Sequence, residues 1–346
     1  TDAPENARKH AGDEPWPTHG QGPPKFGTYA YARKLRPWLD ANLPRFDAAI
    51  VHGNWQYHGL AASRACRRAG VPYLVYPHGM LDPWFNRAYP LKKWKKRLYW
   101  WWGEHPVLRH AAAVLFTCEE ERRLARQSFR PYRVRERVIG YGTRPPEVGE
   151  RSANTASPAG EGPSPRFLGR IQEKKGLDLL LGAYAAFRRE AADPPDLVLA
   201  GPEQQPAFAR RLRDGFPGEG VIWAGTLEGP AKWRALAEAE ALVLPSHQEN
   251  FGLVVAEALA TGTPVLISDK VNIWREIREG GAGLVEPDTA SGTETLLRRW
   301  SALSAGERRA MSDAALRVFA EHFDLRRATQ RLVALVRETV TARENA

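Results

Sequence analysis

Residues 245–268 read PSHQENFGLVVAEALATGTPVLIS, and this stretch decides the fold. An apolar run at 241–244 comes directly before it and is typical of a buried strand. A helical pattern opens near Gly252, and a second apolar run follows at 265–267. Strand, loop, helix and strand in this order predict a βαβ unit with parallel strands.

The same rhythm extends outward in both directions. Strands are expected at 48–52, 73–76, 113–116 and 137–139, and then at 166–168, 197–200, 221–223, 241–244, 265–267 and 283–285. A segment rich in Pro, Gly, Ser and Ala separates the two sets and predicts a linker at 143–165. The fold class is therefore α/β, with two Rossmann-like, doubly wound domains. Such sheets bind ligands at the carboxyl ends of their strands, so a cleft between the domains is expected.

The predicted domain boundaries follow from this pattern. The first domain covers 1–142, the second covers 166–325, and a C-terminal helix at 326–346 can pack back on the first domain. The length of 346 residues agrees with two domains. With 43% hydrophobic residues the chain has enough apolar material for real cores, which excludes global disorder.

Several classes of protein lack support in the sequence. There is no run of about 18 apolar residues for a membrane span, and the polar start TDAPENARKH gives no reason to expect a signal peptide. Cys66 and Cys118 are too few for a disulfide framework or a zinc site, so reduced thiols and a cytoplasmic location are expected, with no metal. Gly-rich dinucleotide, P-loop, HExxH and nucleophile-elbow motifs are all missing.

The positive charge is unevenly placed. Residues 1–150 hold 25 of the 50 basic but only 14 of the 40 acidic residues, which leaves 25 and 26 in the rest. The first half thus carries a net charge of +11 and the rest −1. The first half is suited to an anionic surface or substrate, although a solvated basic face is equally compatible.

Two strand-end loops in the second half carry candidate binding residues. Glu249 lies where loop meets helix, and Glu257 lies eight residues later inside the helix. Backbone N–H groups at a helix start, here those of Asn250, Phe251 and Gly252, favour an anion. The other loop, GRIQEKKG at 169–176, places Arg170 and either Lys174 or Lys175 at the same sheet edge, where cations suit a diphosphate.

These blocks together carry a resemblance. GRIQEKKGLDLLLGAY, LVLAGP, VIWAGTL and LPSHQENFGLVVAEALATGTPVLIS, in this order, resemble the family 4 retaining glycosyltransferases of GT-B fold. The resemblance implies that Glu249 contacts the donor sugar and Glu257 the nucleotide ribose. It also implies that Arg170 and Lys175 hold the diphosphate, with no metal.

The resemblance extends to further positions. It implies that the loop around Gly225 and Leu227 borders the nucleotide base. In the first half, FDAAIVHGNWQYHG and VPYLVYPHGML resemble the loops that face the cleft, and His78 matches a histidine directed at the donor sugar. His52, Trp55 and His58 are expected to touch the acceptor. Family members open with a strand, a Gly-rich loop and a helix. The sequence from Thr1 onward does not contain this opening unit, so the resemblance implies an incomplete first domain.

Residues 91–109, LKKWKKRLYWWWGEHPVLR, combine basic and aromatic side chains. Leu91, Trp94, Leu98 and Trp101 share one face at helical spacing, with Lys92, Lys93, Lys95, Lys96 and Arg97 mostly on others. Such a helix suits a membrane surface with anionic lipid, and the alternative is that its Trp face packs on the sheet. No nucleic-acid-binding motif accompanies the charge.

The expected function is transfer of a sugar, with retention, from a nucleotide diphosphate sugar (UDP- or GDP-sugar) to a hydroxyl acceptor. The acceptor is expected to be a glycan or a lipid-linked glycan in cell-surface polysaccharide assembly at the inner face of a membrane. Two alternatives stay open: a non-catalytic member that binds nucleotide sugar, and a GT-B nucleotide-sugar epimerase.

Overall fold

The computed structural model describes residues 19–21, 25–144 and 164–345. The chain divides into two compact units, unit 1 with the residues up to Ile139 and those from Gln330 onward, and unit 2 with Gly140–Thr329. The linker predicted at 143–165 falls mostly outside the described residues. Ser164 and Pro165 are exceptions, because they pair with the neighbouring strand and belong to a strand themselves.

Unit 1 is built on a four-stranded parallel sheet in the order β1-β2-β3-β4. The strands are β1 (Ala49–His52), β2 (Tyr73–Tyr76), β3 (Ala113–Phe116) and β4 (Glu136–Val138). Its helices are α2 (Leu35–Asn42), α3 (Tyr57–Ala69), α4 (Pro83–Ala88), α5 (Pro90–Tyr99), α6 (His105–His110) and α7 (Glu119–Ala125), with short helices η1 (Gly27–Tyr29), η2 (Leu43–Arg45) and η3 (Trp100–Glu104).

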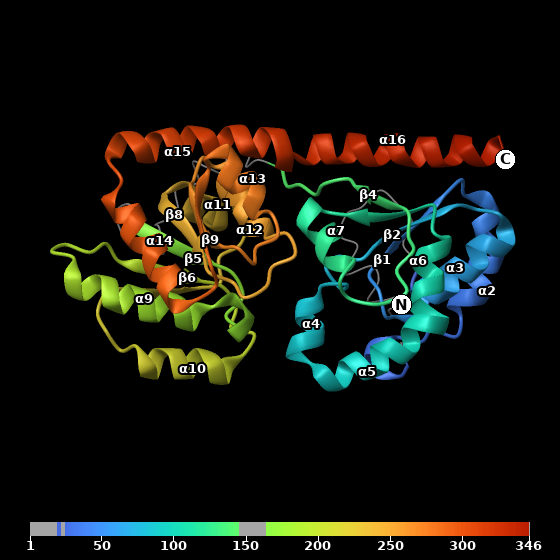
Figure 1. The fold of residues 1–346 in the computed structure, drawn as a ribbon, viewed down its shortest axis with the longest axis horizontal. Helices are drawn as coiled ribbons and strands as arrows, with labels where there is room; N and C mark the ends of the chain where they lie inside the picture. The colour runs from blue at the N-terminus through green and yellow to red at the C-terminus, as the bar shows by residue number, and fades with distance from the viewer. Residues whose placement is uncertain (1–18, 22–24, 145–163, 346) are drawn as a thin grey trace. The chain divides into compact units, whose positions relative to one another are not determined.

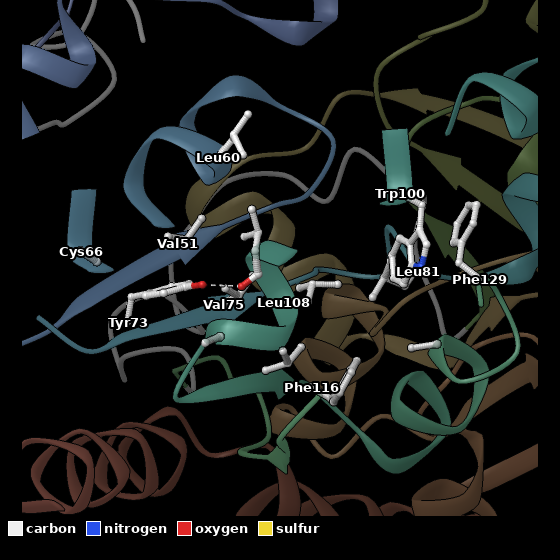
Figure 2. Close-up of a cluster of buried hydrophobic side chains, with 14 of the residues drawn as sticks. Val51, Leu60, Cys66, Tyr73, Val75, Leu81, Trp100, Leu108, Phe116 and Phe129 are labelled. Carbon is white, nitrogen blue, oxygen red and sulfur yellow. Dashed lines mark hydrogen bonds between the residues drawn. The ribbon is translucent and has the colours of Figure 1, made fainter. Parts of the chain in front are cut away.

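Alternating side chains of the sheet in unit 1 build two separate cores. Tyr73 and Val75 enter the larger cluster with Trp100, which Figure 2 shows. Leu74 and Tyr76 point to the other face and form the smaller cluster. All four residues of β2 are buried, as expected for a central parallel strand covered on both faces.

Unit 2 contains a six-stranded parallel sheet in the order β10-β9-β8-β5-β6-β7. Figure 1 labels its strands β5, β6, β8 and β9. The strands are β5 (Ser164–Leu168), β6 (Leu197–Ala200), β7 (Val221–Gly225), β8 (Ala239–Leu244), β9 (Val265–Ser268) and β10 (Gly283–Glu286). Its helices are α9 (Leu177–Glu190), α10 (Pro206–Gly215), α11 (Gly229–Ala237), α12 (Leu253–Ala260), α13 (Trp274–Gly280), α14 (Ala290–Ala302) and α15 (Ala305–Val318), with the short helices η4 (Glu173–Lys175) and η5 (Phe319–Phe323).

The strand order of unit 2 reverses between β5 and β8. The chain runs outward from β5 through β6 to β7, then returns to pair β8 on the opposite side of β5. At such a switch point the loops after the two central strands diverge and leave a crevice for a ligand. The predicted α/β class with two parallel-sheet domains is confirmed, and the expected strands agree with the observed ones to within two residues.

The last helix, α16 (Leu325–Glu344), connects the two units in sequence. Its Leu335 is 7% exposed and packs in the smaller core of unit 1 with Leu74 and Leu115, while the nearby Val333 is 42% exposed. The C-terminal helix therefore contributes a side chain to the core of unit 1.

Truncating Leu335 is expected to destabilise unit 1. Leu335→Ala removes a buried side chain and leaves a cavity, which typically costs roughly 2–5 kcal/mol in the free energy of unfolding. Val333→Ala serves as the control on the same helix and is expected to change stability little. Urea unfolding followed by tryptophan fluorescence measures both variants, and equal midpoints for the two would contradict the packing of Leu335.

Candidate active site

The loops after β5 and β8 are joined directly in unit 2. The His247 N–H donates to the carbonyl of Lys174, with an N···O distance of 2.9 Å. Gly176 has φ +65°, and a Cβ on it would lie 2.2 Å from the carbonyl oxygen of Pro245. Glycine at 176 thus satisfies both the left-handed backbone and the close approach of the two loops.

An ion pair crosses this junction. The Lys175 ammonium donates to the Oε2 atom of Glu249, and both side chains are largely buried. The Lys175 chain passes the loop start, since its Cε lies 4.0 Å from where a Cβ on Gly169 would be. The sequence leaves Lys174 and Lys175 as alternatives, and the structure turns Lys175 inward to the carboxylate.

The backbone of Glu249 is fixed by the next strand-end loop. Its N–H donates to the carbonyl of Lys270 at 2.9 Å, and its carbonyl accepts from the Asn272 N–H at 3.0 Å. Glu249, in the loop after β8, is therefore bound through its side chain to the loop after β5 and through its backbone to the loop after β9. Such anchoring holds a ligand-binding carboxylate in one orientation.

Helix α12 begins directly after Gly252, which has φ +76°. Phe251 is not a free side chain: it is 6% exposed and packs edge-to-face on Tyr141 and Phe323. Its contribution to a binding site is consequently limited to its backbone, whereas Asn250 is half-buried. The positive end of the short α12 helix faces the loop that carries Glu249.

Glu257, in α12, is also paired. Its Oε1 atom accepts from the Lys232 ammonium of α11 at 2.7 Å, and Glu257 is 7% exposed. Lys232 is not among the site residues predicted from the sequence. A single lysine in a helix does not indicate a binding site, and its role is seen only once the fold brings α11 beside α12.

The remaining predicted residues of unit 2 lie at the same edge of the sheet with fewer contacts. Arg170 is exposed and lies two residues after the end of β5, and no ion pair of it is found within the described part of the chain. Gly225 is the last residue of β7, and its carbonyl accepts from the Gly201 N–H at 2.7 Å. Leu227 follows it, partly exposed.

In unit 1 the neighbouring strands β1 and β2 bring two predicted histidines together. His52 ends β1 and His78 follows β2, and their Nδ1 and Nε2 atoms lie 2.8 Å apart, so one ring donates to the other. Burial lowers the pKa of both imidazoles, and a further imidazole lies beside each, His58 for His52 and His52 for His78. Both rings are consequently neutral near pH 7 and suited to hydrogen bonding with hydroxyls.

The third histidine has a backbone role. His58 donates from Nε2 to the carbonyl of His52 at 2.7 Å, and burial lowers its pKa as well. Trp55 adopts φ +69°, with its indole N–H donating to the Met80 carbonyl at 3.1 Å. The loops after β1 and β2 are thereby tied to each other.

A buried carboxylate that the sequence gives no reason to single out holds the His78 loop. Glu121, at the start of α7 and 3% exposed, accepts from the Gly79 N–H at 2.6 Å and from the backbone N–H and hydroxyl of Thr117, both at 2.7 Å. His78 itself has φ +50°, which is unusual outside glycine. Glu121 therefore positions His78 through the following residue.

A second buried carboxylate lies beneath Trp55. Glu104 is 3% exposed, and its Oε2 accepts from the Trp55 backbone N–H at 2.8 Å. Burial raises its pKa to about 7, against the smaller opposing effects of that hydrogen bond and of the nearby Lys96. Glu104 thus keeps its proton in the folded chain at a pH where an exposed glutamate would be ionised.

The predicted helix at 91–109 divides into α5, the π-helical η3 and α6. Its apolar face stays exposed, with Leu91 at 83%, Trp94 at 65%, Leu98 at 71% and Trp101 at 62%. Trp100 alone of the four tryptophans is buried, stacked on Phe129. The alternative in which the Trp94 and Trp101 face packs on the sheet is wrong.

Two parallel-sheet units, one with charged side chains and one with histidines in its strand-end loops, define the class of protein, and comparison with known proteins identifies the family. Residues 3–142 match the family model described as "Glycosyl transferase 4-like domain", and residues 161–317 match "Glycosyl transferases group 1". The chain therefore belongs to the family 4-like glycosyltransferases of GT-B fold.

Curated relatives and solved structures agree with this family. A D-inositol 3-phosphate glycosyltransferase of Jonesia denitrificans is 29% identical over 69% of this chain and 60% of its own length. An alpha-maltose-1-phosphate synthase of Mycolicibacterium smegmatis is 27% identical over 80% of this chain and 77% of its own. The chain thus spans about 60% of the length of the first of these relatives.

Among solved structures, Anabaena Alr3699/HepE in complex with UDP and glucose has a TM-score of 0.68 at 15% identity, covering 90% of this chain and 83% of its own. The sucrose-phosphate synthase of Thermosynechococcus elongatus has a TM-score of 0.66 at 19% identity, covering 89% of this chain and 79% of its own. At these identities the likeness establishes the fold.

Glu104 is expected to make stability depend on pH. Between the ordinary glutamate pKa and about 7 the folded chain holds a proton that the unfolded chain has lost, so stability from this group falls as pH rises. Glu104→Gln keeps an acceptor for the Trp55 N–H and removes this titration. Between pH 5 and pH 8 the free energy of unfolding of the variant is expected to rise, relative to that of the wild type, by an amount on the order of 3 kcal/mol. A difference in thermal midpoint that stays constant over this range would show that Glu104 is not protonated in the fold.

Proposed function

We propose that this chain transfers a sugar from a nucleoside diphosphate sugar, a UDP- or GDP-sugar, to a hydroxyl acceptor with retention at the anomeric carbon. The observation that carries the proposal is the Lys175–Glu249 pair at the switch point, with Arg170 exposed in the segment that joins β5 to Lys175. Family membership supports the same reading, since the matched models are those of glycosyltransferases.

The proposed reaction exchanges one bond to the anomeric carbon for another. The bond from that carbon to the diphosphate oxygen breaks, and the bond to the acceptor oxygen forms on the same face. The acceptor proton moves to the departing phosphate oxygen, which gives a glycoside and a nucleoside diphosphate. Negative charge develops on the diphosphate, and cations placed there stabilise the transition state more than the ground state.

Each side chain of unit 2 has a role in this proposal. Arg170 and Lys175 hold the diphosphate, and Glu249 both orients the Lys175 ammonium and accepts from sugar hydroxyls through its remaining oxygen. Glu257, oriented by Lys232, accepts from the ribose diol. We assign Asn250, Phe251 and Gly252 to the donor through their backbone, and Gly225 and Leu227 to the base.

Unit 1 supplies neutral hydrogen-bonding groups in the same proposal. His78 contacts the donor sugar, while His52, Trp55 and His58 lie on the acceptor side. The neutral imidazoles bond hydroxyls without placing a cation beside an oxocarbenium-like transition state. Because Arg170 and Lys175 provide the positive charge, we propose that no divalent ion is required.

We also propose that the chain works on a membrane surface from the cytoplasmic side, in the assembly of cell-surface or lipid-linked glycans. No helix among the described residues is long and apolar enough to span a bilayer. Exposed Leu91, Trp94 and Leu98 lie on α5, which carries five cations, and exposed Trp101 follows in η3. This combination suits the interface of an anionic bilayer.

Arg170→Ala is expected to weaken binding of the donor nucleotide. Loss of a charge-assisted bond to phosphate costs roughly 1.5–3 kcal/mol, about tenfold or more in affinity. Calorimetry with UDP, GDP and ADP in excess EDTA, repeated with magnesium, measures the effect and the need for metal. Arg189→Ala, an exposed arginine in α9, is the control. Equal affinities for the two variants would refute the role of Arg170, and binding seen only with magnesium would refute metal independence.

Trp94→Ser together with Trp101→Ser is expected to abolish sedimentation with anionic vesicles at low salt. Wild-type binding is expected to fall with added salt, because each Lys or Arg near an anionic surface contributes about 1 kcal/mol that salt screens. Leu316→Ser changes a similarly exposed apolar side chain in unit 2 and should leave sedimentation intact. A wild-type chain that ignores anionic vesicles at low salt would overturn the membrane proposal.

A further inference from the structure

A pocket of about 380 Å³ lies in unit 1 against the inner side of α5. Lys92, Lys93 and Lys96 line one wall, and Asn54, Trp55 and Tyr89 are among the residues that complete it. The three lysines follow helical spacing and therefore share one face of α5, separate from the ridge of Leu91, Trp94 and Leu98. None of the described residues lining this pocket is acidic.

Two of the three lysines lie over aromatic rings, and the buried Glu104 lies near Lys96 without an ion pair to it. The Lys96 ammonium lies 4.6 Å from the Trp55 ring centroid and 5.8 Å from that of Phe85, and the Lys92 ammonium lies 4.8 Å from that of Tyr89. Within the described ranges, no ion pair of these lysines is found. Lys96 is half-buried while Lys92 and Lys93 are exposed, and three ammonium groups on one wall attract an anion.

Asn54 provides an independent indication of a ligand. It is 2% exposed and lines the pocket, yet neither its Oδ1 nor its Nδ2 atom has a hydrogen-bond partner among the described residues. A buried amide without partners is costly, and nearly all buried polar groups in native proteins are satisfied. An occupant that accepts from Nδ2 and donates to Oδ1 would satisfy both atoms.

We propose that this pocket binds a phosphate monoester whose adjoining carbon skeleton carries a hydroxyl. The phosphate oxygens accept from Lys93, Lys96 and Asn54 Nδ2, and the hydroxyl donates to Asn54 Oδ1. Trp55, in the pocket wall, lies in the loop between β1 and α3, which the proposed function assigns to the acceptor, so that the identification of the occupant as an acceptor rests on the proposed function. The chemistry is shared by a soluble phosphorylated polyol and by the headgroup of a lipid phosphomonoester.

The test measures binding of inorganic phosphate to the full chain by the broadening of its ³¹P resonance. Saturating UDP is present so that the proposed donor site is filled. Lys96→Gln and Lys93→Gln are each expected to weaken phosphate binding about tenfold, since each loses a charge-assisted bond. Lys95→Gln, on the same helix but outside the pocket, is the matched control and should change affinity less than twofold. Lys93 is exposed, so its variant is not expected to unfold.

Equal phosphate affinities for Lys93→Gln and Lys95→Gln would overturn the proposal. A wild-type chain that does not bind phosphate at millimolar concentration would overturn it as well. Asn54→Asp, which adds a negative charge at the amide, is expected to abolish phosphate binding, and an unchanged affinity would contradict the role of Asn54. Unchanged UDP affinity in Arg170→Ala, with the Lys93→Gln effect on phosphate intact, would mean that the proposed function fails and the pocket stands. Weaker UDP binding in Arg170→Ala, with no difference between the Lys93 and Lys95 variants, would mean that the pocket fails alone.

Two further arms identify the source of the phosphate. Glycerol 3-phosphate binding more tightly than inorganic phosphate, with the gain lost in Asn54→Asp, supports a soluble phosphorylated acceptor. A preference for vesicles of phosphatidylcholine with phosphatidic acid over vesicles with phosphatidylserine at matched charge, lost in Lys93→Gln, supports a lipid headgroup. Neither pattern appearing would contradict recognition of a monoester.

Discussion

The adjacency of β5 and β8 at the switch point of the second sheet is the constraint on which the candidate site depends. Parallel strands that are neighbours end at the same edge, so the loops that follow them meet. Gly176 permits the close approach, and the Lys175–Glu249 pair then joins residues 74 positions apart in sequence. Removing either charge would leave the other in a largely buried place without compensation.

The same rule governs the first unit with different chemistry. There the neighbouring strands β1 and β2 bring His52 and His78 within hydrogen-bond distance. Unit 2 thus presents paired charges and unit 1 presents neutral imidazoles. Glu121 adds a rigid support, because a buried carboxylate with several donors fixes the backbone beside His78.

Helix α5 divides its side chains between two environments. Its lysines at 92, 93 and 96 line a pocket beside the Trp55 loop, and its apolar residues at 91, 94 and 98 face outward. The π-helical η3 follows, and Trp100 within it enters the core. A single amphipathic segment therefore contributes one side chain to the core, a row of lysines to a pocket and a row of apolar side chains to the surface. For this reason its sequence is compatible both with a helix packed on the core and with a membrane-binding helix.

The sequence alone determined the parallel α/β class, the strand positions, the placement of Glu249 and Arg170 in strand-end loops and that of Glu257 within a helix, because apolar periodicity and turn residues are local signals. It could not choose between Lys174 and Lys175, nor reveal Lys232, Glu121 or the unpartnered amide of Asn54. Those depend on which loops meet and which groups lose water, and burial and pairing between residues far apart in sequence exist only once the sheets have formed.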